Sequence, residues 1–251
     1  TYDRKLRDIF AVQSDIAGEV ARELDVRLGR AALAHIRRGP TTNIAAYELY
    51  LRGNDPAATR SDSLARRSLE YFRQAIALDS TYAAAYAGLA RMHARLAVGD
   101  DTLSRRERLA LAERAALKAV ALDDSLGDAH GALGVVRRET LDLASAETEF
   151  ERAVALEPRS ARFHQWLAQV YALTEGSAKA LAEAHRAVSL DPLSPNAIAD
   201  LARVLLANGR CDEALAEIDK LRAVRPPLLR ARAIAGICYA RKGMWPEAMA
   251  Q

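Results

Sequence analysis

Apolar and small residues recur along this chain with a period of 34 residues. Pro158, Pro192 and Pro226 mark the period, and each closes a run in which apolar and polar positions follow a similar order: AVALEPRS, AVSLDPLS and KLRAVRPP. A period of about 34 residues with small and aromatic residues at fixed offsets is typical of a repeated pair of helices, and proline cannot continue the second helix. The pattern therefore predicts a stack of helical hairpins whose neighbours bury each other's apolar faces.

Four segments keep this register, and they begin at Gly127, Ala161, Pro195 and Leu229. Small residues at equivalent places let the helices approach closely, and leucine or tyrosine fills the adjoining gaps. The patterned positions of the four first helices are His130, Leu133, Gly134 and Arg137; His164, Leu167, Ala168 and Tyr171; Ile198, Leu201, Ala202 and Leu205; and Arg232, Ala235, Gly236 and Tyr239.

These positions match the pattern W-x2-L-G-x2-Y, then A-x3-F, then P, so the chain resembles the tetratricopeptide repeat (TPR) family. Arg137 stands where the family usually has tyrosine, and His130 and Arg232 stand where an aromatic residue is expected. The resemblance implies an all-α fold, a right-handed superhelical solenoid of antiparallel helix pairs. The repeats are expected over residues 41–80, 83–124, 127–158, 161–192, 195–226 and 229–251, the last of them incomplete.

The second of these repeats contains an insertion between its two helices, VGDDTLSRRE. Ser104 is followed three residues later by Glu107, which matches the capping box found at helix N-termini. A fresh helix is therefore predicted to begin near Arg105.

Residues 1–40 do not follow the repeat. Their apolar residues recur three or four positions apart, which predicts an amphipathic helical linker or cap that ends before Gly39 and Pro40. The stretch TYDRKLRDIFAVQSDIA resembles the junction between a TolB-type amino-terminal domain and TPR repeats in bacterial signalling proteins. Such proteins carry a nucleotide cyclase, a Ser/Thr kinase or a winged-helix DNA-binding domain further upstream, so the resemblance implies that this chain is a fragment of a larger protein.

Composition narrows the class of protein. Hydrophobic residues make up 50% of the chain, yet no apolar stretch approaches the roughly 18 residues needed to span a bilayer. The net charge of +3 is too small to indicate a nucleic-acid partner by itself. Cys211 and Cys238 are isolated in the sequence and indicate neither a metal site nor a disulfide scaffold. We expect a cytoplasmic protein, or an extracytoplasmic one if its parent is a membrane-anchored kinase or transcription regulator.

Motifs for catalysis are missing from the sequence. It contains no GxxxxGK[ST], HExxH or GxSxG motif, and no His and Cys residues with metal-ligand spacing. His130 and His164 occupy the same offset of consecutive repeats, but that offset normally holds an aromatic residue that packs between helices, so packing is favoured over metal binding. We expect no enzymatic activity, catalytic residue, cofactor or metal.

Binding is the function that the resemblance favours. In the TPR family the concave groove is lined mainly by first helices, at offsets 2, 5, 9 and 12 of each repeat. Reading these offsets here gives small residues that leave room for a partner's backbone, a few apolar residues, and polar side chains with which a partner could form hydrogen bonds and ion pairs. The candidate groove residues are Arg91, Asp128, Arg138, Arg162, Gln165, Gln169, Asn196, Arg203 and Arg230. The family's clamp for a peptide C-terminus is not matched by Gly131, Val135 and Trp166.

Two functions remain open. The first is a protein-interaction scaffold whose groove binds a peptide or a partner domain, with acidic character expected from the arginine row, or binds the protein's own upstream effector domain. The second is a docking surface for an acidic polymer such as nucleic acid. Nucleic acid would favour aromatic platforms for its bases, and here the aromatic residues fall at packing offsets except for Trp166. The first function is therefore preferred, although several of the arginines could serve only to solvate the surface.

Overall fold

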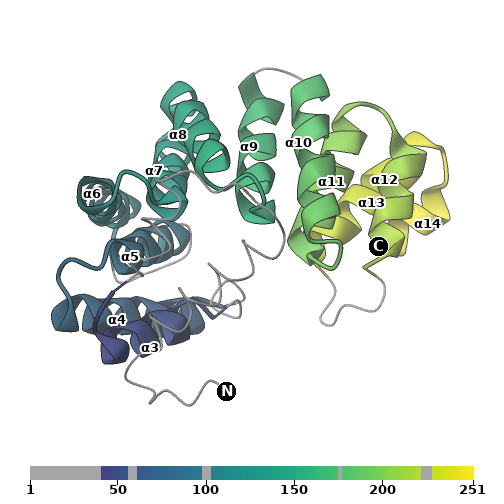
Figure 1. Cartoon of the computed structure of the whole chain (residues 1–251). Helices are drawn as coiled ribbons and strands as arrows, with labels where there is room; N and C mark the ends of the chain where they lie inside the picture. Colours follow the sequence, from purple (N-terminus) through teal and green to yellow (C-terminus); the bar gives the residue numbers. More distant parts are fainter. Residues whose placement is uncertain (1–40, 56–60, 98–102, 175–176, 222–227) are drawn as a thin grey trace, which may run out of the picture. The chain divides into compact units, whose positions relative to one another are not determined.

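The computed structural model describes residues 41–55, 61–97, 103–174, 177–221 and 228–251, and within these ranges every regular element is a helix (Figure 1). The chain divides into two compact units, Thr1–Asp124 and Ser125–Gln251. The helical linker predicted over residues 1–40 lies outside the described residues. The fold is an all-α helical-repeat solenoid, as the sequence predicts, and each unit is considered by itself below.

The first unit contains two helical hairpins. Their described helices are α3 (Ile44–Gly53), α4 (Asp62–Leu78), α5 (Ala83–Leu96) and α6 (Arg105–Leu122). The predicted capping box is present, since the Ser104 side chain accepts a hydrogen bond from the Glu107 amide and the Glu107 carboxylate accepts one from the Ser104 amide. The prediction that a helix begins at Arg105 is thereby confirmed.

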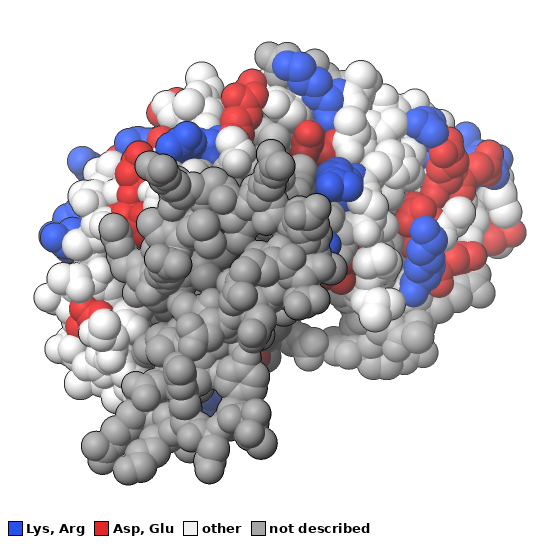
Figure 2. All heavy atoms as spheres, viewed as in Figure 1, with Lys and Arg blue, Asp and Glu red and all other residues white. Residues whose placement is uncertain are grey.

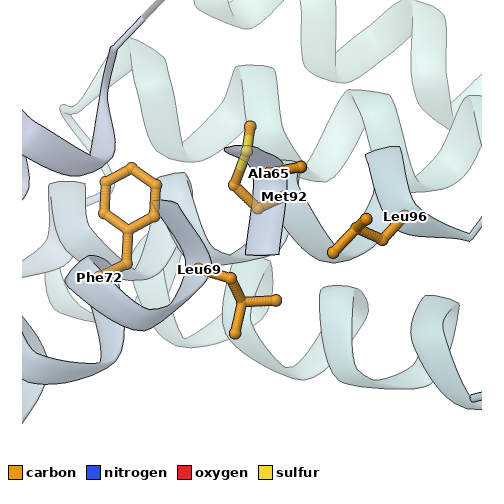
Figure 3. Packing of buried hydrophobic residues seen from close by; sticks show 5 residues of the cluster. All are labelled: Ala65, Leu69, Phe72, Met92 and Leu96. Carbon is orange, nitrogen blue, oxygen red and sulfur yellow. The ribbon is translucent and has the colours of Figure 1, made fainter. Parts of the chain in front are cut away.

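Phe72 is central to the packing of the first unit. Its ring is fully buried, and it belongs to a cluster that also contains Leu69 from α4 and Met92 and Leu96 from α5 (Figure 3). A Cβ atom placed on Gly53 would lie 2.8 Å from Cε1 of this ring, which is closer than atoms in contact can approach. The absence of a side chain there allows α3 to pack directly against the aromatic ring.

The second unit repeats with the period seen in the sequence. Its helices are α7 (Gly127–Glu139), α8 (Leu143–Leu156), α9 (Ala161–Thr174), α10 (Ser177–Leu190), α11 (Pro195–Ala207), α12 (Cys211–Asp219), α13 (Leu229–Arg241) and α14 (Trp245–Met249). The first helices begin 34 residues apart, and so do the second helices. Consecutive helices pack against each other through the unit (Figure 1). The helix pairs predicted from the proline period are thus confirmed.

His130 and His164 stand at the offset where an aromatic residue is expected, and each buried ring has a hydrogen-bond partner. Each ring is buried, and its Nδ1 lies beside a glutamate on the second helix of the same repeat: 2.7 Å from Glu149 Oε2 for His130 and 2.5 Å from Glu183 Oε2 for His164. Nε2 of His164 also lies 3.0 Å from the carbonyl oxygen of Pro158. These histidines therefore join two helices through hydrogen bonds, which suits a buried polar group.

Two glycines at the same repeat offset have different surroundings. A Cβ atom on Gly134 would lie 2.6 Å from Cε1 of Phe150, which is fully buried and has no space to move into. At Gly236 the nearest atom would be the carbonyl oxygen of Ala248 at 3.5 Å, an ordinary contact distance. Only Gly134 is required by close packing.

We predict opposite outcomes for alanine at these two glycines. Gly134→Ala should lower the free energy of unfolding by about 1–3 kcal/mol, because it overpacks the contact with Phe150. Gly236→Ala should be neutral or stabilising by up to about 1 kcal/mol, because alanine favours the helix. Urea unfolding of both variants measures the difference, and equal stability would contradict the assigned contact.

Three described turns between a first and a second helix, those after α7, α11 and α13, share one backbone conformation. Leu141, Gly209 and Gly243 have positive φ angles of 64°, 73° and 75°, and each follows a first helix at the same offset. The amide of the next residue bonds back to the carbonyl five residues earlier, as for Asp142 and the Arg137 carbonyl at 2.9 Å. This closure usually requires glycine, and Leu141 adopts it with its side chain 80% exposed, so it gains little burial in return.

Leu141→Gly should therefore stabilise the protein by about 1 kcal/mol, since it relieves the left-handed strain of a branched side chain. Leu193 is a matched control because it is also an exposed turn leucine, at 89%, and does not have a positive φ. Leu193→Gly should bring no gain. Thermal unfolding of the two variants provides the measurement, and a loss of stability in Leu141→Gly would refute the strain.

His93 is a buried base among cations in the first unit. It is 2% exposed, and its Nδ1 lies 3.4 Å from Nη1 of Arg108. Burial, followed by the positive charges of Arg108, Arg73 and Arg114, lowers the pKa of His93 to about 4. The imidazole is therefore neutral in the folded protein at neutral pH and protonates more readily when the chain unfolds.

This lowered pKa predicts a loss of stability in mild acid. Above about pH 6.5 both states carry a neutral His93, and between about pH 6.5 and 4 only the unfolded state gains the proton, so stability falls as the pH falls. The loss should reach about 3 kcal/mol at most, at about 1.4 kcal/mol per pKa unit. Urea unfolding from pH 7 to pH 4.5 should show a shallower decline for His93→Gln, and parallel curves would contradict the prediction.

Candidate binding face

Eight of the nine predicted groove residues lie on the first helices of the second unit, α7, α9, α11 and α13. We call this set the first-helix face; it comprises Asp128, Arg138, Arg162, Gln165, Gln169, Asn196, Arg203 and Arg230. The ninth residue, Arg91, lies on α5 in the first unit. It is 8% exposed, and its Nη2 donates a hydrogen bond to Asn54 Oδ1 at 2.9 Å. Arg91 thus joins α5 to the residue that caps α3.

Polar contacts connect neighbouring first helices across this face. Arg162 on α9 donates to Asp128 on α7, one repeat earlier, and Arg138 on α7 donates to Gln169 on α9. The guanidinium of Arg162 also lies 5.3 Å from the centre of the Trp166 ring, a cation–π distance. The positions that the 34-residue register places side by side therefore bond to each other in the free protein.

Asp200 on α11 contacts four members of the first-helix face, two glutamines and two arginines. It is 5% exposed, and its Oδ2 accepts hydrogen bonds from Nε2 of Gln165 at 2.5 Å and of Gln169 at 2.7 Å. Asp200 is not among the predicted groove residues, because it occupies offset 6 of its repeat and not offset 2, 5, 9 or 12. An acidic residue inside the apolar run PNAIADLARVLLA was the signal that could have indicated it.

Arg203 and Arg230 approach the other oxygen of the same carboxylate. Nε of Arg203 and Nη1 of Arg230 each lie 3.8 Å from Asp200 Oδ1. Nη2 of Arg230 also donates to the side-chain oxygen of Asn196 at 2.5 Å, whereas Arg203 makes no hydrogen bond within the described residues. The two arginine side chains are 40% and 43% exposed, so their guanidinium groups remain accessible to a ligand.

The charge of the face is mixed. Counted with the adjoining Glu139 and Asp200, which form ion pairs with its arginines, it holds four guanidinium groups, of Arg138, Arg162, Arg203 and Arg230, and three carboxylates, of Asp128, Glu139 and Asp200. The local excess is therefore one positive charge rather than an uncompensated row. Outside this face, ion pairs such as Arg210 with Glu213 also occur on the C-terminal helices of the second unit, where Figure 2 shows acidic and basic side chains next to one another.

Other features of the second unit lie apart from this network. A hollow of about 250 Å³ between α12 and α13 is lined mainly by apolar side chains such as Ile218, Leu228 and Tyr239, and by none of the predicted groove residues. Cys211 and Cys238 are both buried, and their side chains form a hydrogen bond. Burial is the main cause that raises the pKa of the Cys238 thiol to about 12, and the hydrogen bond with Cys211 is the second.

Among the described residues, no group of three or more His, Cys, Asp or Glu is arranged to hold a metal ion. None of the described helices combines the length and apolar character needed to cross a bilayer.

Neither a known family model nor a curated protein matches the sequence. Solved TPR proteins are similar in structure. A thermophilic TPR protein of Thermus thermophilus has a TM-score of 0.62 and 23% identity, covering 78% of this chain and 100% of its own. The pilF protein of Pseudomonas aeruginosa has a TM-score of 0.60 and 17% identity, covering 82% and 88%. YrrB, described as a TPR protein with an unusual peptide-binding site, has a TM-score of 0.50 and 25% identity, covering 72% and 89%.

This chain has the fold of TPR proteins. The likeness applies to the helical hairpins and their stacking, which the regular helix starts of the second unit display directly. The first helices that stack against one another in this fold also carry the polar network around Asp200.

Proposed function

We propose that the protein is a non-catalytic interaction scaffold whose first-helix face binds a peptide segment of a partner protein. The observation that carries the proposal is the polar network centred on Asp200, which spans α9, α11 and α13. Its hydrogen bonds hold long side chains in fixed rotamers before a ligand arrives, so less conformational entropy is lost on binding. The peptide-binding site described for YrrB is consistent with this function.

The side chains of the face suit a peptide chemically. Arg203 and Arg230 are 40% and 43% exposed and offer N–H groups to carbonyl or carboxylate oxygens. Ala233, exposed on α13, leaves room for a backbone, and Ile237 one turn later is 47% exposed and offers apolar contact. A segment with acidic residues is the best match, because the face carries an excess of one positive charge.

The partner could also be another part of the parent protein. The resemblance of residues 1–40 to the junction found in bacterial signalling proteins supports a regulatory role in a larger cytoplasmic protein, in which the repeats report to an upstream effector domain. Docking of nucleic acid is the weaker candidate. Asp128, Glu139 and Asp200 stand among the arginines and would repel a phosphate backbone, which favours uniformly basic surfaces.

A bulky residue on the face should block peptide binding without changing its charge. Peptides selected from a random phage-displayed library against the whole chain are measured by fluorescence anisotropy with the wild type, Ala233→Trp and Ala182→Trp. Ala182 is a matched control because it is also an exposed helical alanine, on the second helix α10. Ala233→Trp should weaken binding about tenfold or more, corresponding to about 1.4 kcal/mol.

Two outcomes would contradict this function. Equal affinities for the three proteins would place the binding site elsewhere. Selected peptides that bind no better than their scrambled versions would argue against peptide recognition.

A further inference from the structure

We propose that Arg203 and Arg230 form a two-pronged site for one carboxylate of the partner, the side chain of an aspartate or glutamate. The proposal rests on the proposed function and assigns it a specificity-determining pair. The sequence alone offered five equivalent arginines, whereas the structure distinguishes these two from the others by the contacts they make.

Three arginines of the predicted row are already engaged. Arg91 is buried and bonds to Asn54. Arg138 donates to both Gln169 and Glu139, and Arg162 pairs with Asp128 while its guanidinium lies over aromatic rings. A ligand would have to displace these contacts before it could use the same N–H groups.

Arg203 and Arg230 differ because their carboxylate partner is too distant for a hydrogen bond. An N–H···O bond spans about 2.7–3.2 Å between heavy atoms, and both arginines stand 3.8 Å from Asp200 Oδ1. The contact is therefore electrostatic attraction that leaves N–H donors of both groups available. Within the described part of the chain, only Nη2 of the Arg230 nitrogens donates hydrogen bonds, and both go to Asn196. Arg203 donates no side-chain hydrogen bond to any described residue.

The two guanidinium groups are close enough to serve one ligand. Because Nε of Arg203 and Nη1 of Arg230 are both 3.8 Å from the same oxygen, they lie at most 7.6 Å apart, twice that distance. A carboxylate has two oxygens that can each accept from a different arginine, and charge-assisted bonds of this kind are about twice as strong as neutral ones.

Asp200 fixes both the position and the charge of the site. Gln165 and Gln169 hold its Oδ2, which leaves Oδ1 towards the arginines. One buried carboxylate between two guanidinium groups gives a local charge of plus one, and a single carboxylate from the ligand neutralises it. We therefore assign an aspartate or glutamate side chain rather than a polyphosphate or nucleic acid as the group that binds.

The test uses two capped peptides, acetyl-Gly-Gly-Glu-Gly-Gly-amide and its Gln counterpart, titrated to tens of millimolar into the whole chain at low salt. The arginine Nε–H resonances are followed by NMR, with assignments from single Arg→Gln variants. The Glu peptide should shift the signals of Arg203 and Arg230 and bind at least about tenfold more tightly than the Gln peptide, as expected for charge-assisted bonds.

The double variant Arg203→Gln/Arg230→Gln should lose this preference. Arg159→Gln/Arg186→Gln is its control, since both residues are exposed in the second unit, in a turn and on the second helix α10, and it removes the same charge. The control should retain the preference, and circular dichroism should show unchanged helix content in both double variants.

The assignment is overturned if the Glu peptide shifts neither arginine, if it binds no better than the Gln peptide, or if the preference survives in Arg203→Gln/Arg230→Gln. Displacement of the Glu peptide by equimolar inorganic phosphate would overturn the specificity for a carboxylate. If the Glu-peptide test fails while Ala233→Trp still weakens the binding of library peptides, the arginine pair is refuted as the carboxylate site. The proposed function is then unaffected. If Arg203 and Arg230 bind the Glu peptide but the phage-displayed library yields no peptide that binds the protein, the proposed function is refuted instead.

Discussion

In two of the helical hairpins, one in each unit, the contact of an aromatic ring with a glycine on the facing helix sets the spacing between the two helices. Phe150 on α8 lies against Gly134 on α7, and Phe72 on α4 lies against Gly53 on α3 in the other unit. Dense packing transmits such a contact to its neighbours, because buried side chains have little room to adjust. Each hairpin then presents its next surface in a fixed orientation, and the following repeat stacks on it.

The binding face follows from this stacking. Since the first helices of the second unit begin 34 residues apart, side chains 31 to 35 residues apart in sequence meet across neighbouring helices. The network of Asp128 with Arg162, and of Asp200 with Gln165 and Gln169, is the polar counterpart of the apolar stack. Its acidic members hold the arginines in place, so the face is ordered rather than a set of freely moving charges.

Much of the fold can be predicted from the sequence because the repeat is local and regular. The proline period indicates the spacing of the helix pairs in the second unit, and the Ser104 capping box locates the start of α6 in the first. The interactions of the site are harder to predict, since they depend on which side chains meet across helices. Arg91 follows the same offset rule as Arg203 but is buried against Asn54, and Asp200 occupies offset 6 of its repeat, outside the four groove offsets.

The central claim is that the repeat register builds one face for a peptide ligand, and mapping where a bound peptide lies tests it most directly. A selected peptide carrying a photoreactive benzophenone side chain is cross-linked to the whole chain, and the attachment sites are identified by mass spectrometry. The account predicts cross-links confined to the first helices α7, α9, α11 and α13. Cross-links on the second helices α8, α10 and α12 would contradict it.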